Sequence, residues 1–198
     1  MPAKKIVVLL SGGFRSTSLL YDLHARGHDL YPVVSYTKEE YERPAVATAA
    51  SHCLATSGAW KTIVLPALAQ TTAPGHQALL YFSAALYAHS LDIRLVATGA
   101  FQTLHTTAPD SATAYTIDLI AAVNRLCLES RLNTRIIGPY LYVTTAQLLG
   151  KVSAYGLDPE TTWNCDRHGP TPCHTCRGCQ AFESAQKEAA LINASQHA

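Results

Sequence analysis

Apolar and polar positions divide the chain into two kinds of segment. Longer segments in which apolar residues recur at helical spacing cover residues 16–26, 43–57, 76–90, 112–131, 144–155 and 180–194. Short apolar runs typical of buried strands cover residues 5–10, 30–36, 61–65, 93–98 and 135–137. Strands that alternate with helices predict βαβ units and an α/β fold with a parallel sheet. Right-handed crossovers make the strand order 3-2-1-4-5 the most economical one.

Size and composition limit the classes of protein that fit. The chain has 198 residues and a net charge of +1, so we expect one domain and no direct contact with nucleic acid. Charged residues make up only 15%, which fits either an oligomer interface or neutral, alanine-rich helices. Neither a signal peptide nor a membrane-spanning apolar run is evident, which favours a cytoplasmic protein.

The segment between the first strand and the first helix reads Ser-Gly-Gly-Phe-Arg-Ser-Thr over residues 11–17. Glycines allow a sharp turn that brings backbone N–H groups close to a ligand, and a helix N-terminus attracts anions. We therefore expect Ser11, Gly12, Gly13, Ser16 and Thr17 to bind a phosphate or pyrophosphate. An ordinary glycine-containing turn is the alternative. A Walker loop is excluded, because no Gly-Lys-Ser/Thr follows.

Four cysteines near the C-terminus have the spacing C-x7-C-x2-C-x2-C. They are Cys165, Cys173, Cys176 and Cys179. Four thiolates at this spacing are typical of a structural zinc site, in which His168 or His174 could replace one cysteine. An iron–sulfur cluster accepts the same ligands, and reduced thiols without a metal are the third reading. Residues 161–198 are therefore expected to form a zinc knuckle and closing helix beside a core over residues 1–160.

The loop and the cysteines together resemble the 7-cyano-7-deazaguanine synthase (QueC) family, whose members carry the Ser-Gly-Gly-x-Asp-Ser loop of ATP pyrophosphatases. Shorter pieces follow in the family's order: Pro74-Gly75-His76-Gln77, Ala97-Thr98-Gly99, Pro109-Asp110 and Pro139. The resemblance implies a Rossmann-like core of the adenine nucleotide alpha hydrolase type. It also implies ATP and Mg²⁺ at the loop, structural Zn²⁺ and a homodimer. The reaction converts 7-carboxy-7-deazaguanine to its amide and nitrile through adenylation and ammonia. Ser35, Tyr36 and Gly99 would lie near the nucleotide.

Three positions depart from the family's pattern. Arg15 replaces the loop aspartate, His76-Gln77 replace Arg-Asn, and Val143-Thr144-Thr145 replace a segment that carries Asp-Lys. Arginine cannot bind Mg²⁺ but pairs with phosphate. Arg15 is therefore expected either to bind an anion of the ligand directly, or to point into solvent in a protein that has lost catalysis.

Few residues offer chemistry in addition to the loop. Arg15, His76 and Asp110 are the catalytic candidates, although His76 at a helix start would equally well be a cap. His105 and Asp110 follow the fourth strand and are candidates for contacts with a 7-deazaguanine. As loop residues, both would equally well be solvated polar groups. His52 lies on a predicted helix and is expected at the surface.

The residues leave three hypotheses open. The first is a divergent ATP-dependent synthase of 7-deazaguanine derivatives. The second is a degenerate homologue that binds a nucleotide or deazaguanine, or partners an active relative. The third is an ATP pyrophosphatase of another kind, such as a tRNA thiolation enzyme.

Overall fold

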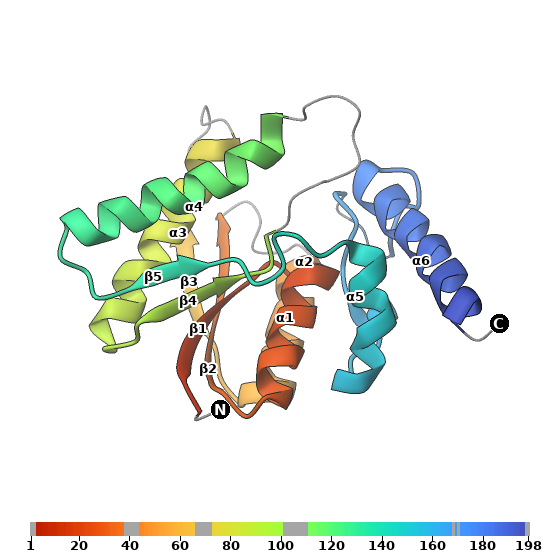
Figure 1. Ribbon diagram of the computed structural model, residues 1–198, viewed down its shortest axis with the longest axis horizontal. Helices are drawn as coiled ribbons and strands as arrows, with labels where there is room; N and C mark the ends of the chain where they lie inside the picture. The colour runs from red at the N-terminus through yellow and green to blue at the C-terminus, as the bar shows by residue number, and fades with distance from the viewer. Residues whose placement is uncertain are drawn as a thin grey trace.

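The computed structural model describes residues 3–37, 44–65, 73–100, 111–167, 169 and 171–196. Five parallel strands form one sheet in the order β3-β2-β1-β4-β5, which confirms the predicted topology (Figure 1). The strands are β1 (Lys5–Leu10), β2 (Asp29–Thr37), β3 (Lys61–Leu65), β4 (Leu95–Thr98) and β5 (Arg135–Ile137). Leu10 pairs with Val34, and Leu9 with Thr98. The carboxyl ends of β1, β2 and β4 therefore meet at one edge.

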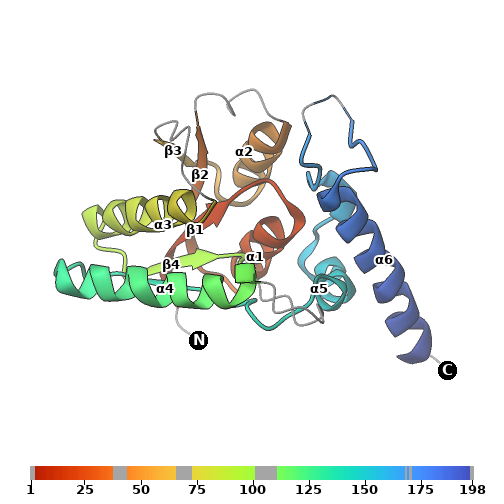
Figure 2. The same ribbon diagram turned by 90° about the horizontal axis from the view of Figure 1, so that it is seen from above.

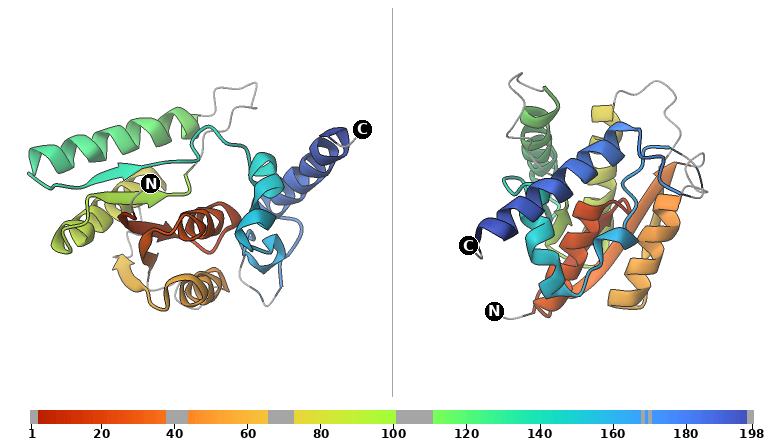
Figure 3. Two further views of the ribbon diagram at one scale, coloured as in Figure 1. Left: turned by 60° about the horizontal axis from the view of Figure 1, so that its bottom comes forward. Right: turned by 90° about the vertical axis from the view of Figure 1, so that its right-hand side faces the viewer.

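Helices cover both faces of the sheet. They are α1 (Phe14–Ala25), α2 (Pro44–Ser57), α3 (Ala73–Ser90), α4 (Ser111–Glu129), α5 (Thr145–Val152) and α6 (Arg177–Gln196), with 3-10 turns η2 (Ser153–Tyr155) and η3 (Pro159–Thr161). Helices α1, α2 and α5 pack on one face, and α3 and α4 on the other (Figure 2). Helix α5 lies between α1 and α6 (Figure 3). The predicted division of the chain at residue 160 stays a prediction.

Strand β1 is the centre of the core because both of its faces are buried. Ile6, Val8 and Leu10 pack toward α1, α2 and α5, while Val7 and Leu9 pack toward α3 and α4. This two-sided burial explains why the sequence shows a continuous apolar run there and no alternation. The same burial fixes the point at which the chain leaves the sheet, directly before Ser11.

Several element boundaries differ from the predicted ones. Helix α3 begins three residues earlier, since Pro74 is compatible with the first turn of a helix. Strand β4 begins two residues later, because the Ile93 N–H donates to the Ala88 carbonyl at 2.8 Å and closes α3. That closure uses Asp92 with a φ of 54°, a conformation that the sequence did not signal.

None of the helices within the described ranges is long and apolar enough to cross a membrane.

Candidate functional site

A cavity of about 400 Å³ lies at the carboxyl ends of β1 and β4. Its lining residues are Leu9, Leu10, Ser11, Gly13, Phe14, Arg15, Ser16, Gln77, Leu80, Tyr81, Thr98, Gly99, Ala100, Thr116 and Asn164. The turn after β1 and the end of β4 thus border one space, as expected where parallel strands diverge. Ligands of open α/β sheets bind at this edge, so the cavity is the candidate site.

Residues 11–17, called the phosphate loop below, form a tight turn into α1. Gly12 has a φ of 78°, which favours glycine, and Gly13 is the N-cap residue of α1. The Ser16 hydroxyl donates to the Gly13 carbonyl at 3.0 Å and lies 3.1 Å from the Ser11 hydroxyl. Within the described residues, the backbone N–H groups of Gly12 and Gly13 make no hydrogen bond. Gly13 lines the cavity, so its N–H at the helix N-terminus is available to an anion, whereas Gly12 is buried.

Gly99 allows the end of β4 to lie directly against the loop. A Cβ atom at this position would lie 2.8 Å from both the backbone nitrogen and the Cα of Ser16. Any other residue would push β4 away from α1. The family resemblance implied a role for Gly99 near the nucleotide, and the structure adds a close approach to Ser16 that requires glycine there.

Arg15 is directed into the protein. Its Nη2 donates to the Tyr140 carbonyl at 2.8 Å, and its Nε donates to the Gly99 carbonyl at 3.3 Å. Nη1 lies 3.4 Å from the Thr145 hydroxyl. Desolvation by burial lowers the pKa of the guanidinium to about 10, and Tyr140 opposes this shift. Two of the positions that depart from the family pattern, Arg15 and Thr145, are therefore in contact. The side chain does not point into solvent.

Three uncharged side chains, linked by hydrogen bonds, line another side of the cavity. Gln77 Nε2 donates to the Tyr81 hydroxyl at 2.8 Å, which lies 3.4 Å from the Thr98 hydroxyl. Burial raises the pKa of Tyr81, so the phenol stays protonated at neutral pH. These groups can orient a polar ligand without adding charge.

The other residues that the sequence suggested for ligand binding or catalysis lie at different positions around the sheet, and two of them lie outside the described residues. The Thr17 hydroxyl donates to the Gly13 carbonyl at 3.0 Å. Ser35 and Tyr36 lie near the end of β2, where they pair with β3 beyond the last residue pair between β2 and β1. His76 lies in the first turn of α3, one residue before Gln77. The loop that contains His105 and Asp110 lies outside the described residues.

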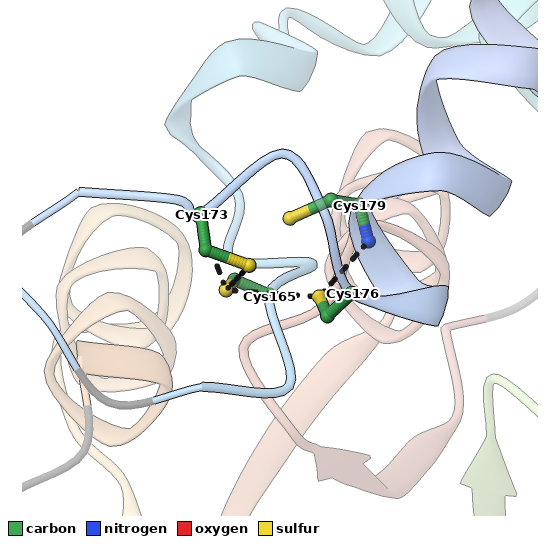
Figure 4. Close-up of side chains that lie close together, drawn as sticks. All are labelled: Cys165, Cys173, Cys176 and Cys179. Carbon is green, nitrogen blue, oxygen red and sulfur yellow. Dashed lines mark hydrogen bonds between the residues drawn. The ribbon is translucent and has the colours of Figure 1, made fainter.

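The four predicted metal ligands come together, as Figure 4 shows. The sulfurs of Cys165, Cys173, Cys176 and Cys179 all lie within 4.8 Å of one another. The sulfur of Cys165 lies 3.5 Å from that of Cys173 and 3.8 Å from that of Cys176. Hydrogen bonds from the backbone and side chain of Thr175 lower the pKa of the Cys173 thiol to about 5. The group has the ligand set and compactness of a metal centre.

Backbone N–H groups also point at these sulfurs. Cys165 Sγ accepts from the N–H groups of Arg167 and Cys173, both at 3.4 Å. Cys176 Sγ accepts from Asp166 at 3.3 Å and from Cys179 at 3.4 Å. These N–H donors fix the positions of the two sulfurs within the group. The segment over residues 165–179 is called the cysteine knuckle below.

The residues before the knuckle touch the phosphate loop, which the sequence did not predict. The Trp163 N–H donates to the Gly12 carbonyl at 2.9 Å. The Asn164 side-chain oxygen accepts from the Phe14 N–H, also at 2.9 Å. The ring of Phe182 in α6 packs against Phe14, with centroids 5.4 Å apart. The residues that flank the knuckle are thus in direct contact with the phosphate loop of the candidate site.

His52, expected at the surface, is instead only 7% exposed. Its Nδ1 lies 3.1 Å from the Tyr21 hydroxyl, and its Nε2 lies 3.1 Å from the Thr161 carbonyl. Since a carbonyl only accepts, Nε2 carries the proton in this contact. The expectation was wrong because η3 covers this face of α2.

Comparisons with known proteins agree with the geometry. A family model described as "Queuosine biosynthesis protein QueC" matches residues 56–190, a range that begins after the phosphate loop. The chain is 24% identical to the 7-cyano-7-deazaguanine synthase of Caldicellulosiruptor bescii, covering 88% of this chain and 89% of that protein. It is 26% identical to the synthase of Clostridium kluyveri, covering 94% of each.

Two solved structures share the fold. One is a 4-thiouridine synthetase–RNA complex with bound ATP, with a TM-score of 0.57 and 16% identity over 94% of this chain. The other is the U34-tRNA thiolase NcsA from Methanococcus maripaludis with its 4Fe–4S cluster, with a TM-score of 0.50 and 14% identity over 97% of this chain. The chain spans 50% of the first structure's length and 66% of the second's.

Proposed function

The chain belongs to the QueC family, and from this premise we propose that it binds ATP at the phosphate loop and activates the carboxylate of a 7-deazaguanine. The observation that carries the proposal is the N–H group of Gly13 at the start of α1. Gly13 lines the cavity together with Ser11, and the Ser11 hydroxyl can turn from Ser16 to the same anion. The relatives are named 7-cyano-7-deazaguanine synthases, and the resemblance to that family implies 7-carboxy-7-deazaguanine as the substrate.

In the proposed reaction, adenylation converts a carboxylate oxygen of the substrate, which is a poor leaving group, into AMP, which is a good one. A carboxylate oxygen of the substrate attacks the α-phosphorus of ATP, and pyrophosphate departs. Ammonia adds to the acyl carbon, AMP leaves and a proton is released, which yields the amide. Gln77, Tyr81 and Thr98 offer neutral polar groups to orient the substrate, and we propose Ser35, Tyr36, Gly99, His105 and Asp110 as further contacts. A homodimer is proposed as well, and light scattering tests it.

Arg15 gives the second candidate its support. At the loop position where the family carries aspartate, the guanidinium is held by Tyr140, Gly99 and Thr145. The side chain offers no ligand to Mg²⁺, which would neutralise departing pyrophosphate. A nucleotide- or deazaguanine-binding protein without turnover is therefore the alternative function. In both cases ATP binding is expected to depend little on Mg²⁺, since a fixed cation borders the cavity.

We propose Zn²⁺ as the metal of the knuckle. With Zn–S bonds of about 2.3 Å, the sulfurs of a tetrahedral site lie about 3.8 Å apart. The sulfur separations of 3.5 and 3.8 Å around Cys165 support this size. A 4Fe–4S cluster places four irons and four sulfides between its thiolates and needs a wider spacing. The four cysteines would hold Zn²⁺ in a closed sphere, so its contribution is to folding.

Two measurements test the proposed function. The protein is incubated with 7-carboxy-7-deazaguanine, ATP, Mg²⁺ and ammonium, and mass spectrometry looks for the amide, the nitrile and AMP. Calorimetry measures ATP affinity with and without Mg²⁺ in the wild type, in Ser11→Ala and in the matched control Ser90→Ala. The exposed Ser90 hydroxyl donates to the Tyr87 carbonyl at the end of α3, and Ser90 does not line the cavity. ATP-dependent product supports the synthase, whereas ATP binding without product supports the binding protein. No ATP binding, or equal affinity in all three proteins, would overturn the phosphate-loop site.

A further inference from the structure

The two residues that precede Cys165 hold the phosphate loop in place. The Trp163 N–H is bound to the Gly12 carbonyl, and the Asn164 amide oxygen to the Phe14 N–H, each at 2.9 Å. Asn164 is followed directly by Cys165, the first cysteine of the knuckle. A change in the position of Cys165 is therefore transmitted directly to the loop.

Asn164 caps the start of α1, which is usually done by a residue at the helix start itself. The first N–H groups of a helix lack partners inside the helix, and the residue at the N-cap normally supplies one. The N-cap of α1 is Gly13, which has no side chain and makes no such bond. The partner comes from Asn164 instead, 150 positions later in the chain. Glycine can thus occupy the turn while the helix start stays capped.

The Asn164 side chain is itself oriented by its other end. Its Nδ2 donates to the Thr162 hydroxyl at 3.0 Å, and that hydroxyl donates to the Pro159 carbonyl at 2.7 Å. The amide nitrogen is thereby directed to Thr162 and the oxygen to Phe14. This arrangement holds only while residues 162–165 keep their path along the loop.

The knuckle keeps that path in place. The Asp166 N–H donates to Cys176 Sγ, and the Asp166 carboxylate accepts from the Gly178 N–H at 2.9 Å, where α6 begins. No disulfide joins the four cysteines, so a metal ion bound to all four sulfurs is what would cross-link the knuckle. Loss of the metal would therefore loosen the segment that positions Asn164.

We propose that metal occupancy of the cysteine knuckle sets the conformation of the phosphate loop and its affinity for anions, with Asn164 as the positioning residue. The proposal rests on the proposed function, because the anion is the phosphate chain of ATP. The knuckle then stabilises more than its own fold, since it also prepares the ligand-binding turn.

The first experiment needs no ligand. Hydrogen–deuterium exchange is measured for residues 11–20 in the wild type and Asn164→Ala, each with its metal and after treatment with a zinc chelator. We expect exchange of the loop amides to increase about fivefold on metal removal and on Asn164→Ala, in line with loss of a helix cap. In Asn164→Ala, metal removal should add less than it does in the wild type, since only the Trp163 bond to Gly12 then links the knuckle to the loop. Unchanged exchange in the wild type after verified metal loss would overturn the proposal, and so would fully additive effects.

The second experiment uses inorganic pyrophosphate as the probe. Affinity should fall about fivefold in metal-free wild type and in Asn164→Ala, but not in Asn133→Ala, an exposed position at the other end of the sheet. Asn164→Asp keeps the acceptor but adds a negative charge beside the anion. Compared with Asn164→Ala, it should restore thermal stability and the protection of the loop amides from hydrogen–deuterium exchange, while pyrophosphate binding stays weak. A merely structural role predicts that Asp restores both. If the wild type binds no pyrophosphate, the proposed function fails, while the exchange measurement still decides the inference.

Discussion

Replacing Arg15 by alanine should change the stability of the protein far less than the loss of its bonds to Gly99, Tyr140 and Thr145 implies. The short bond to the Tyr140 carbonyl, at 2.8 Å, is expected to contribute about 2 kcal/mol, and the two longer ones about 0.5–1 kcal/mol each. Burial opposes this gain. A pKa lowered from 12.5 to about 10 corresponds to about 3 kcal/mol of unfavourable free energy for the charged form.

The two contributions nearly cancel, so we expect Arg15→Ala to shift the free energy of unfolding by about 1 kcal/mol or less at pH 7. Because the folded pKa lies below that of free arginine, the unfavourable contribution is complete at neutral pH. It is relieved only as the pH rises above about 10.

Urea denaturation of the wild type, Arg15→Ala and Arg15→Met measures this balance, with methionine keeping the apolar part of the side chain. A loss of 3 kcal/mol or more in both variants would refute the reasoning, since it would mean that desolvation of the guanidinium is small.

Three further predictions concern the core and the metal centre. Cys176→Ser should lower metal content and thermal stability together, and a folded, metal-free variant with unchanged melting temperature would contradict the metal site. Burial raises the pKa of Cys53 from 9.0 to about 12, so its unfolded thiol ionises first and stability falls as the pH rises above 9. Relative to Cys53→Ala, the wild type should lose about 1.4 kcal/mol more between pH 7 and pH 10, and parallel stability curves would argue against this cause. Tyr140→Phe should cost about 1–2 kcal/mol, because the buried hydroxyl donates to Asp22 at 3.0 Å, whereas exposed Tyr142→Phe should have no effect on urea denaturation.

The strand order and the metal ligands could be predicted because both follow from local sequence. Apolar runs with intervening helices leave few right-handed topologies, and the cysteine spacing alone brings Cys173, Cys176 and Cys179 to one turn. The meeting of the phosphate loop with Gly99 follows from the topology as well, since parallel strands end at a common edge.

The contacts of Arg15 and Asn164 could not be predicted, and the reason is physical. Arg15 binds the carbonyl groups of Gly99 and Tyr140, and a backbone carbonyl has no sequence signature. Asn164 caps a helix that begins 150 residues earlier, whereas sequence signals of capping extend over three or four positions. His52 was misplaced for a related reason, because periodicity within α2 does not reveal that η3 covers it.

The distance along the chain between Phe14 and Asn164 also fixes when the protein can complete the turn after β1 during synthesis. A nascent chain emerges from its N-terminus, and all five strands have been made once residue 137 is in place. The turn after β1 is therefore present from the start, but its cap is added only after residue 164 has been translated. A chain that stops before this residue has every strand of the sheet and an uncapped turn. The start of α1 thus becomes capped only after every strand of the sheet has been made.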